Sequence, residues 1–195
     1  MEITMDAIKE LRDKTGISVM QCKRALEESG GDMEKALVIL RKAAGAAAAK
    51  KADRALGAGA IQSYIHGNGA VGVLVELRSE TDFVSGNADF MTLARDIAMH
   101  VAASSPQYLK REDVPEAALT SAREVFEKEA EGKPAEVKEK IVAGKMDSYW
   151  SQIVLLEQPF IKEPERTIKD LIEAATQKFG EKIELTRFTR FAMRD

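Results

Sequence analysis

The sequence has few of the residues on which disulfides, metal sites and nucleophilic catalysis depend. Its 195 residues include one cysteine, Cys22, and two histidines, His66 and His100. A single cysteine excludes an internal disulfide, and no cysteine or histidine has a partner at the spacing of zinc ligands. No G-x-S-x-G motif marks a nucleophile either. We therefore expect no metal, no cofactor and no enzyme activity.

Phosphate-binding glycine motifs are also missing. Neither G-x-x-x-x-G-K-[S/T] nor G-x-G-x-x-G occurs in the chain. The glycine-rich segment Gly67-Asn68-Gly69 joins two expected strands, so no helix N-terminus follows it to hold a phosphate. The chain itself is expected to bind no nucleotide. These absences favour a protein that acts on another protein.

Long apolar runs and a strong charge of one sign are absent too. No run approaches the roughly 18 residues of a membrane span. The first residues include early acids, unlike a secretory signal. A net charge of −3 gives no broad basic surface for nucleic acid. We expect a cytoplasmic protein without direct contact to nucleic acid or membrane, whose 45% hydrophobic content can form a real core.

Residues 1–44 have the pattern of three short helices. Thr4, Ser18 and Asp32 are the expected N-caps, and glycines follow the first two helices. Turns this short predict a compact three-helix docking module that resembles a ubiquitin-associated domain. The apolar positions expected on the buried sides are Met5, Ile8, Leu11, Val19, Cys22, Ala25, Leu26, Met33, Ala36, Leu37 and Leu40.

The exposed residues of this module include Lys9, Arg12, Met20 and Lys23. Met20 has two interpretations that the pattern leaves open. It can cover the core of the module, or it can be a flexible apolar contact for another protein. The alanine-rich residues 45–59 then predict a helical connector, with a helix over residues 46–56.

Residues 60–195 predict an α+β core domain in which helices pack on a three-stranded antiparallel sheet. Strands are expected at 61–66 and from Val71, joined by a tight hairpin, and at 183–192. Asn87 caps the clearest helix, which ends before Pro106. Further helices are expected over 116–131, then to about Gly144, then through Trp150, and from 168 to 179. The inner side of the 116–131 helix is expected to carry Leu119, Ala122, Val125 and Phe126.

The stretch from Val71 to Ser85 is the segment in which we expect the functional site of the chain. A strand with alternating apolar residues leads into polar residues and then the isolated apolar pair Phe83 and Val84. Phe83 can fold into the core or stand outside as an anchor for a partner. The pattern alone favours burial, because Phe is among the most often buried residue types.

Several segments in the right order resemble elongation factor Ts of translation. They are LRDKTGISVMQCKRALEESGGDMEKALVILRK (11–42), VELRSETDFV, AMHVAA, GKMDSYW, LLEQPFI and RFTRF. The resemblance runs from Ile8 to Phe191. Ser18 and Val19 depart from the family's usual glycine and methionine, and Arg78-Ser79 replaces a usual Asn-Cys. Longer members carry a second core module and a helical coiled-coil arm, for which we expect no room here.

The resemblance implies a guanine-nucleotide exchange factor for elongation factor Tu, which binds the GDP form and stays bound until GTP arrives. The family's TDFV loop, here Thr81, Asp82, Phe83 and Val84, would disturb the magnesium and phosphate site of the partner's G domain. Lys9, Arg12 and Met20 would dock the N-terminal module on the same domain. A homodimer is a further hypothesis for short members. The alternative is an adaptor without exchange activity, in which Phe83 matters only for folding.

Overall fold

The computed structural model describes residues 3–193, which form two compact units. Three segments make up the first unit: Met1–Gln62, Val75–Arg95 and Asp170–Thr186. The second unit contains Ser63–Leu74, Asp96–Lys169 and Arg187–Asp195. The three strands of the main sheet and one long helix pass from one unit into the other. The sequence-based division at residues 44 and 59 stays a prediction.

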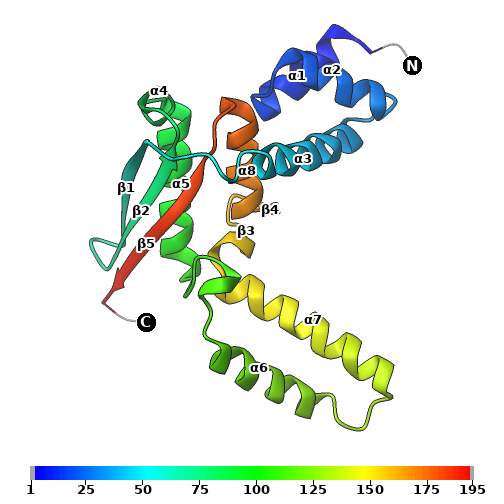
Figure 1. Cartoon of the computed structure of the whole chain (residues 1–195), viewed down its shortest axis with the longest axis vertical. Helices are drawn as coiled ribbons and strands as arrows, with labels where there is room; N and C mark the ends of the chain where they lie inside the picture. The colour runs from blue at the N-terminus through cyan, green and yellow to red at the C-terminus, as the bar shows by residue number, and fades with distance from the viewer. Residues whose placement is uncertain (1–2, 194–195) are drawn as a thin grey trace. The chain divides into compact units, whose positions relative to one another are not determined.

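Three N-terminal helices form as predicted: α1 (Met5–Thr15), α2 (Val19–Glu28) and α3 (Met33–Ala49) (Figure 1). The oxygens of Thr4, Ser18 and Asp32 accept hydrogen bonds from backbone N–H groups three residues on, at 3.3, 3.4 and 3.1 Å. Gly16 follows α1 in the left-handed conformation, with φ of 67°. The buried residues of the module are Ile8, Leu11, Ile17, Cys22, Ala25, Leu26, Ala36 and Leu40.

Helix α3 differs from its prediction at its C-terminal end. It runs through Gly45 to Ala49, and residues 50–54 form turns rather than the helix predicted to Leu56. Tertiary contacts explain the early end. Arg54 pairs with Glu80 at 3.1 Å, and the Leu56 carbonyl accepts a hydrogen bond from the Arg78 guanidinium at 2.9 Å. These contacts hold residues 54–56 against the sheet, which outweighs the helix propensity of the alanines.

The main sheet confirms the predicted α+β class. Its strands β1 (Ala58–His66), β2 (Val71–Ser79) and β5 (Glu184–Ala192) are antiparallel, in the order β1-β2-β5. Asn68 and its two flanking glycines have positive φ, as the predicted hairpin requires. Alternate residues of the central strand β2 are buried, namely Val73, Val75, Leu77 and Ser79.

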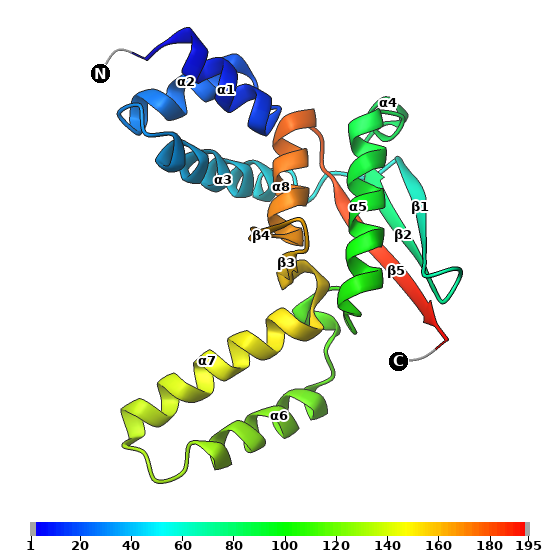
Figure 2. The ribbon, with the colours of Figure 1, turned by 180° about the vertical axis from the view of Figure 1, so that it is seen from behind.

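Helix α5 (Ala88–Ser104) lies along one face of this sheet, and α8 (Ile168–Phe179) lies beside it (Figure 2). Asn87 caps α5 as predicted, accepting from Asp89 N–H at 2.8 Å. The rings of Phe90 and Phe179 join the two helices edge to face, with centroids 6.4 Å apart. The buried residues that α5 and α8 contribute to the core are Phe90, Ala94, Ile97, Ala98, His100, Val101, Ala102, Ile168, Leu171, Ile172, Ala175 and Thr176.

Residues 107–157 form a helical arm; helices were predicted in this region, but their pairing into an arm was not. Helix α6 (Glu116–Glu129) and helix α7 (Ala135–Ile153) lie side by side as a hairpin (Figure 1). The predicted break at Gly144 is wrong: α7 is continuous, because packing such as the edge-to-face pair of Phe126 and Tyr149 offsets the glycine. Val125 is also half exposed rather than on the inner side.

Short elements flank the arm. Two turns of 3-10 helix, η1 (Arg111–Asp113) and η2 (Leu155–Glu157), lie before α6 and after α7. A second sheet, which the prediction missed, pairs β3 (Pro159–Phe160) with β4 (Glu163–Thr167). Strand β3 has only two residues, and β4 has no alternating apolar residues, so the sequence shows no strand pattern there.

Candidate partner-binding site

The segment between β2 and α5 contains a helix of its own. Helix α4 (Asp82–Ser85) is a single turn, in which Gly86 N donates to the Asp82 carbonyl at 2.8 Å. Thr81 precedes it with an extended backbone, and the Thr81 side chain does not cap the helix. Residues predicted as a loop therefore have a defined backbone conformation.

Within this turn, neighbouring side chains lie in opposite environments. Phe83 is 86% exposed, more than any other large apolar side chain in residues 3–193. Val84 and Ser85 are 4% and 8% exposed. The burial of Phe83 that the apolar pattern alone favoured is therefore wrong. Keeping a Phe side chain in water forgoes about 1.5–3 kcal/mol of burial free energy, so its position does not serve the stability of the chain.

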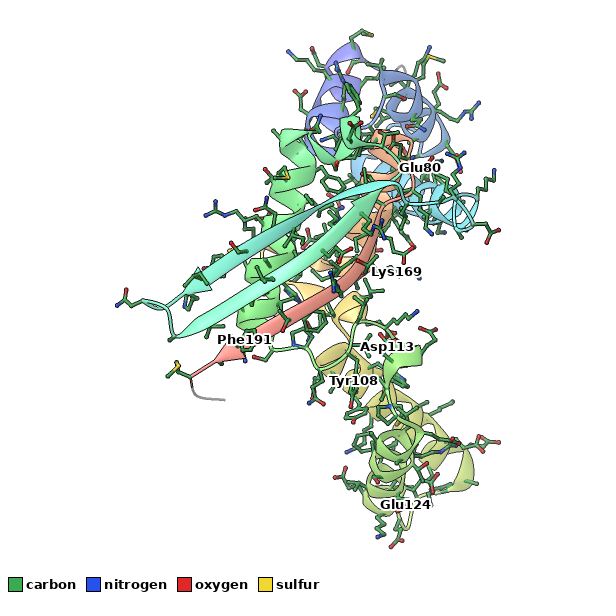
Figure 3. The ribbon with its side chains drawn as sticks, turned by 60° about the vertical axis from the view of Figure 1, so that its left-hand side comes forward. Glu80, Tyr108, Asp113, Glu124, Lys169 and Phe191 are labelled. Atoms are coloured by element: carbon green, nitrogen blue, oxygen red, sulfur yellow. The ribbon has the colours of Figure 1, made fainter. Side chains whose placement is uncertain are left out.

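Two carboxylates hold the segment before Phe83: Glu181, from a distant part of the chain, and Glu80, from the segment itself. The Glu181 carboxylate accepts hydrogen bonds from Thr81 N–H at 3.0 Å and from the Thr81 hydroxyl at 2.6 Å. The Glu80 carboxylate, labelled at the end of β2 in Figure 3, accepts from Lys182 N–H at 2.6 Å and from Arg54 at 3.1 Å. The Lys182 N–H, with Arg54 adding to it, holds the pKa of Glu80 below its usual value.

Thr81, Asp82 and Phe83 are exposed together, whereas Val84 is an anchor in the core. An additional internal hydrogen bond runs from the buried Ser79 hydroxyl to the Thr81 carbonyl at 2.9 Å. The arrangement presents an aromatic ring and a carboxylate to solvent on a backbone fixed from both sides. An exposed aromatic ring on a fixed backbone is typical of a protein-binding anchor, and these side chains include no nucleophile paired with a base.

The N-terminal module exposes the predicted docking residues. Lys9 and Arg12 lie on the solvent side of α1, and Met20 is 76% exposed on α2. The alternative in which Met20 covers the core is therefore excluded. Met5 and Val19, predicted as buried, are 72% and 41% exposed, because the module closes its core without their side chains.

A shallow groove of about 320 Å³ runs along α2 beside Met20. Its other lining residues are Gln21, Lys23, Arg24 and Glu27. Lys23 and Glu27 form an exposed ion pair at 3.7 Å, which leaves a mixed-charge rim around an apolar side chain. An apolar centre with a polar rim is the general layout of protein contacts. Both the module and the loop of Phe83 belong to the first compact unit.

The histidines and the cysteine that the sequence analysis considered as catalytic or metal-binding residues take part in ordinary packing and hydrogen bonding. His100 is fully buried; its Nε2 is 2.9 Å from Gln158 Oε1, and its Nδ1 accepts from Ile161 N–H at 3.4 Å. His66 stacks on Tyr64 at the surface. Burial raises the pKa of the Cys22 thiol, which disfavours a nucleophilic thiolate.

Within residues 3–193, no three His, Cys, Asp or Glu side chains gather as a metal site. In the same range, no helix combines the length and the apolar character that crossing a membrane requires.

Comparison with known proteins gives one consistent result. The family model for elongation factor TS matches residues 46–195. The chain is 51% identical over 193 residues to elongation factor Ts of Carboxydothermus hydrogenoformans, covering 98% of this chain and 89% of the relative. It is 52% identical over 192 residues to elongation factor Ts of Thermodesulfovibrio yellowstonii, covering 98% and 96%. For elongation factor Ts of Acetivibrio thermocellus, the identity is 48% over 191 residues, with coverage of 97% and 89%.

The fold and the site define an α+β protein that has an N-terminal three-helix module and presents an exposed aromatic side chain on an anchored turn. The family model covers residues 46–195, and the relatives cover nearly the whole chain. The chain belongs to the elongation factor Ts family, and its class is that of the translation elongation factors.

Proposed function

We propose that this protein is a guanine-nucleotide exchange factor for elongation factor Tu and that the loop of Phe83 performs the exchange. The observation that carries the proposal is the 86% exposure of Phe83 on a backbone whose neighbours are anchored. Membership of the elongation factor Ts family supports the choice of elongation factor Tu, in its GDP form, as the proposed partner. No covalent step is needed, since exchange only requires that binding of the factor weakens the binding of GDP.

The physical steps follow from the side chains. An aromatic ring brings about 150–250 Å² of contact area and can hold two structural elements of the partner apart. Magnesium beside a diphosphate demands near-ideal octahedral geometry, so small displacements weaken its binding. The Asp82 carboxylate next to the ring adds a negative charge at the phosphate side of the site. Linkage is reciprocal: if the factor weakens GDP, GDP weakens the factor by the same free energy.

The N-terminal module would dock on the G domain through Lys9, Arg12 and Met20. Their exposure supports this assignment, and Met5 and Val19 extend the apolar part of the surface. Methionine suits such a contact because its side chain is flexible and polarizable. Docking through the module would raise the effective concentration of the Phe83 loop at the nucleotide site.

The decisive experiment measures release of labelled GDP from elongation factor Tu with wild type and Phe83→Ala. Truncation of a central aromatic anchor costs about 2 kcal/mol or more, which corresponds to a loss of about 30-fold in exchange efficiency. Because Phe83 is exposed, the unfolding free energy should change by less than about 0.5 kcal/mol. Val125→Ala, which shortens an exposed apolar side chain on the arm, is the control and should exchange like wild type.

An unchanged exchange rate in a folded Phe83→Ala protein would refute the assignment of the loop. No acceleration by wild type would refute the exchange function itself and leave the adaptor as the better description. The adaptor also predicts that Phe83→Ala damages folding, which the exposure of the ring disfavours.

A homodimer is the second part of the proposal. In the second unit, Ile65 of β1 and Leu74 of β2 are 64% and 47% exposed. They lie on one face of the sheet, since a Cβ at Gly72 would contact Ile65 and Leu74 is two residues on. Strand β5 is an edge strand of the sheet, and its Phe191 is 72% exposed. An exposed edge beside apolar side chains is suited to pairing with a second copy.

A further inference from the structure

Two pairs of consecutive residues in the first unit hydrogen-bond to each other at the start of the Phe83 turn. Glu80 and Thr81 follow β2, and Glu181 and Lys182 follow α8. Each pair supplies one carboxylate and one backbone N–H: Glu181 accepts from Thr81, and Glu80 accepts from Lys182. We call these four residues the carboxylate clamp. Hydrogen bonds to ionised carboxylates are about twice as strong as neutral ones.

The geometry at Thr81 differs from that of an ordinary helix start. Thr81 occupies the N-cap position of α4, where a threonine hydroxyl usually accepts from the helix backbone. Here the hydroxyl donates to Glu181 at 2.6 Å instead, and no side chain caps α4. A four-residue helix without a cap has no stability of its own in water. The contact from Glu181 therefore contributes to the conformation that the turn adopts.

The clamp and the buried Val84 together set the direction of the Phe83 ring. Thr81 is fixed by Glu181, and Val84 is fixed in the core, with only Asp82 and Phe83 between them. Two anchors three residues apart leave the intervening turn little freedom. An anchor that is ordered before binding avoids the entropy cost of ordering it in the complex.

We propose that Glu181 is a positioning residue for nucleotide exchange, which acts by holding Thr81 so that Phe83 is presented to the partner. This inference rests on the exchange function proposed above. Glu181 lies 100 residues from Thr81 in the chain and outside the TDFV sequence. Its role is indirect. Both oxygens of the Glu181 carboxylate already accept hydrogen bonds from Thr81, and Phe83 makes the contact with the partner.

The test is a double-mutant cycle read by release of labelled GDP from elongation factor Tu. Glu181→Ala in the wild-type background should lower exchange efficiency about 3- to 10-fold, as expected for loss of a solvent-exposed hydrogen bond. The same substitution in the Phe83→Ala background should have no further effect, because the ring that it positions is gone. Glu181→Gln keeps an acceptor oxygen and should restore part of the rate.

Glu184→Ala is the matched control. Glu184 lies three residues further along the chain, is exposed and pairs with the Lys182 side chain at 2.9 Å, so its removal leaves both carboxylates of the clamp in place. It should exchange like wild type. Amide hydrogen exchange at Thr81 gives a readout without the partner and should speed up in Glu181→Ala. Glu181→Gln serves for both readouts if the alanine variant does not fold.

The outcomes separate the two proposals. If wild type accelerates GDP release and Phe83→Ala does not, but Glu181→Ala equals wild type, the positioning role is refuted and the exchange function stands. Equal losses from Glu181→Ala in both backgrounds would also refute it, since Glu181 would then act independently of Phe83. If wild type does not accelerate release, the exchange function fails, and the positioning role fails with it.

Discussion

Phe83 and Val84 are neighbours in the chain with opposite surroundings, so that one turn is anchored in the core and also presents an aromatic ring to solvent. Val84 packs in the core, whereas Phe83 is 86% exposed. The Phe83 ring gains little burial free energy within the chain, and it would gain that free energy only if a partner covered it. At the scale of single residues, exposure therefore carries more functional information than residue type.

His100 is the residue whose state depends most directly on pH. It is buried with Phe160 beside it, and burial lowers its pKa from the usual 6.5 although the hydrogen bond to Gln158 partly opposes this. The neutral ring suits its neighbours, because Nδ1 accepts from Ile161 N–H. Protonation would place a second donor at Nδ1 and break that hydrogen bond.

The sign of the pH effect follows from the lowered pKa of His100. Below about pH 6.5 the unfolded chain takes up the proton more readily than the folded chain, so stability is full above that pH and falls as the pH drops. The thermal midpoint of wild type should decrease between pH 7.5 and 5.5. His100→Gln should be less stable at pH 7.5 but show a shallower decrease, whereas the exposed His66→Gln should keep the wild-type slope. Equal slopes for wild type and His100→Gln would contradict the prediction.

At the scale of elements, two helices continue through a glycine. Gly45 lies inside α3 and Gly144 inside α7, each at a cost of about 1 kcal/mol relative to alanine. Packing against neighbouring elements offsets this loss of helix stability, so the helix ends are set by tertiary contacts and not by the glycines. In strand β1, by contrast, the close packing requires a glycine, Gly59.

The same substitution at two glycines should therefore have opposite effects. A Cβ at Gly59 of β1 would lie 2.7 Å from the Leu77 carbonyl oxygen, and Gly59→Ala should lower the unfolding free energy by about 1–3 kcal/mol. Gly144 has no atom within 4 Å of such a Cβ, so Gly144→Ala should raise the unfolding free energy by about 0.5–1 kcal/mol. Chemical denaturation of both variants measures the difference. Wild-type stability of Gly59→Ala would show that β1 and β2 approach less closely.

At the scale of the whole molecule, the proposed homodimer is testable through the exposed face of the sheet. Wild type should sediment with twice the mass of the chain at micromolar concentration. Leu74→Glu or Ile65→Glu would place a charge on this apolar face and should give monomers, because an unpaired charge buried at an interface costs several kcal/mol. Val125→Glu on the arm is the control and should remain dimeric. A monomeric wild type would rule the homodimer out.

Much of the fold was predictable because its signals are local. The caps Thr4, Ser18 and Asp32, the hairpin at Asn68 and the alternation along β2 all act over a few residues. The TDFV sequence identified the candidate site by resemblance to a family. By contrast, the arm was missed because the pairing of α6 with α7 depends on contacts such as Phe126 with Tyr149, which no local pattern specifies.

The sequence by itself determined the starts of the three N-terminal helices, the hairpin at Asn68 and the family that the chain resembles. Only the tertiary structure decided that Phe83 is exposed, that α3 ends at Ala49 and that Glu181 holds Thr81. The physical reason is separation along the chain. Helix and turn propensities act between residues at most four apart, whereas exposure and the carboxylate clamp depend on segments about 100 residues apart being packed together.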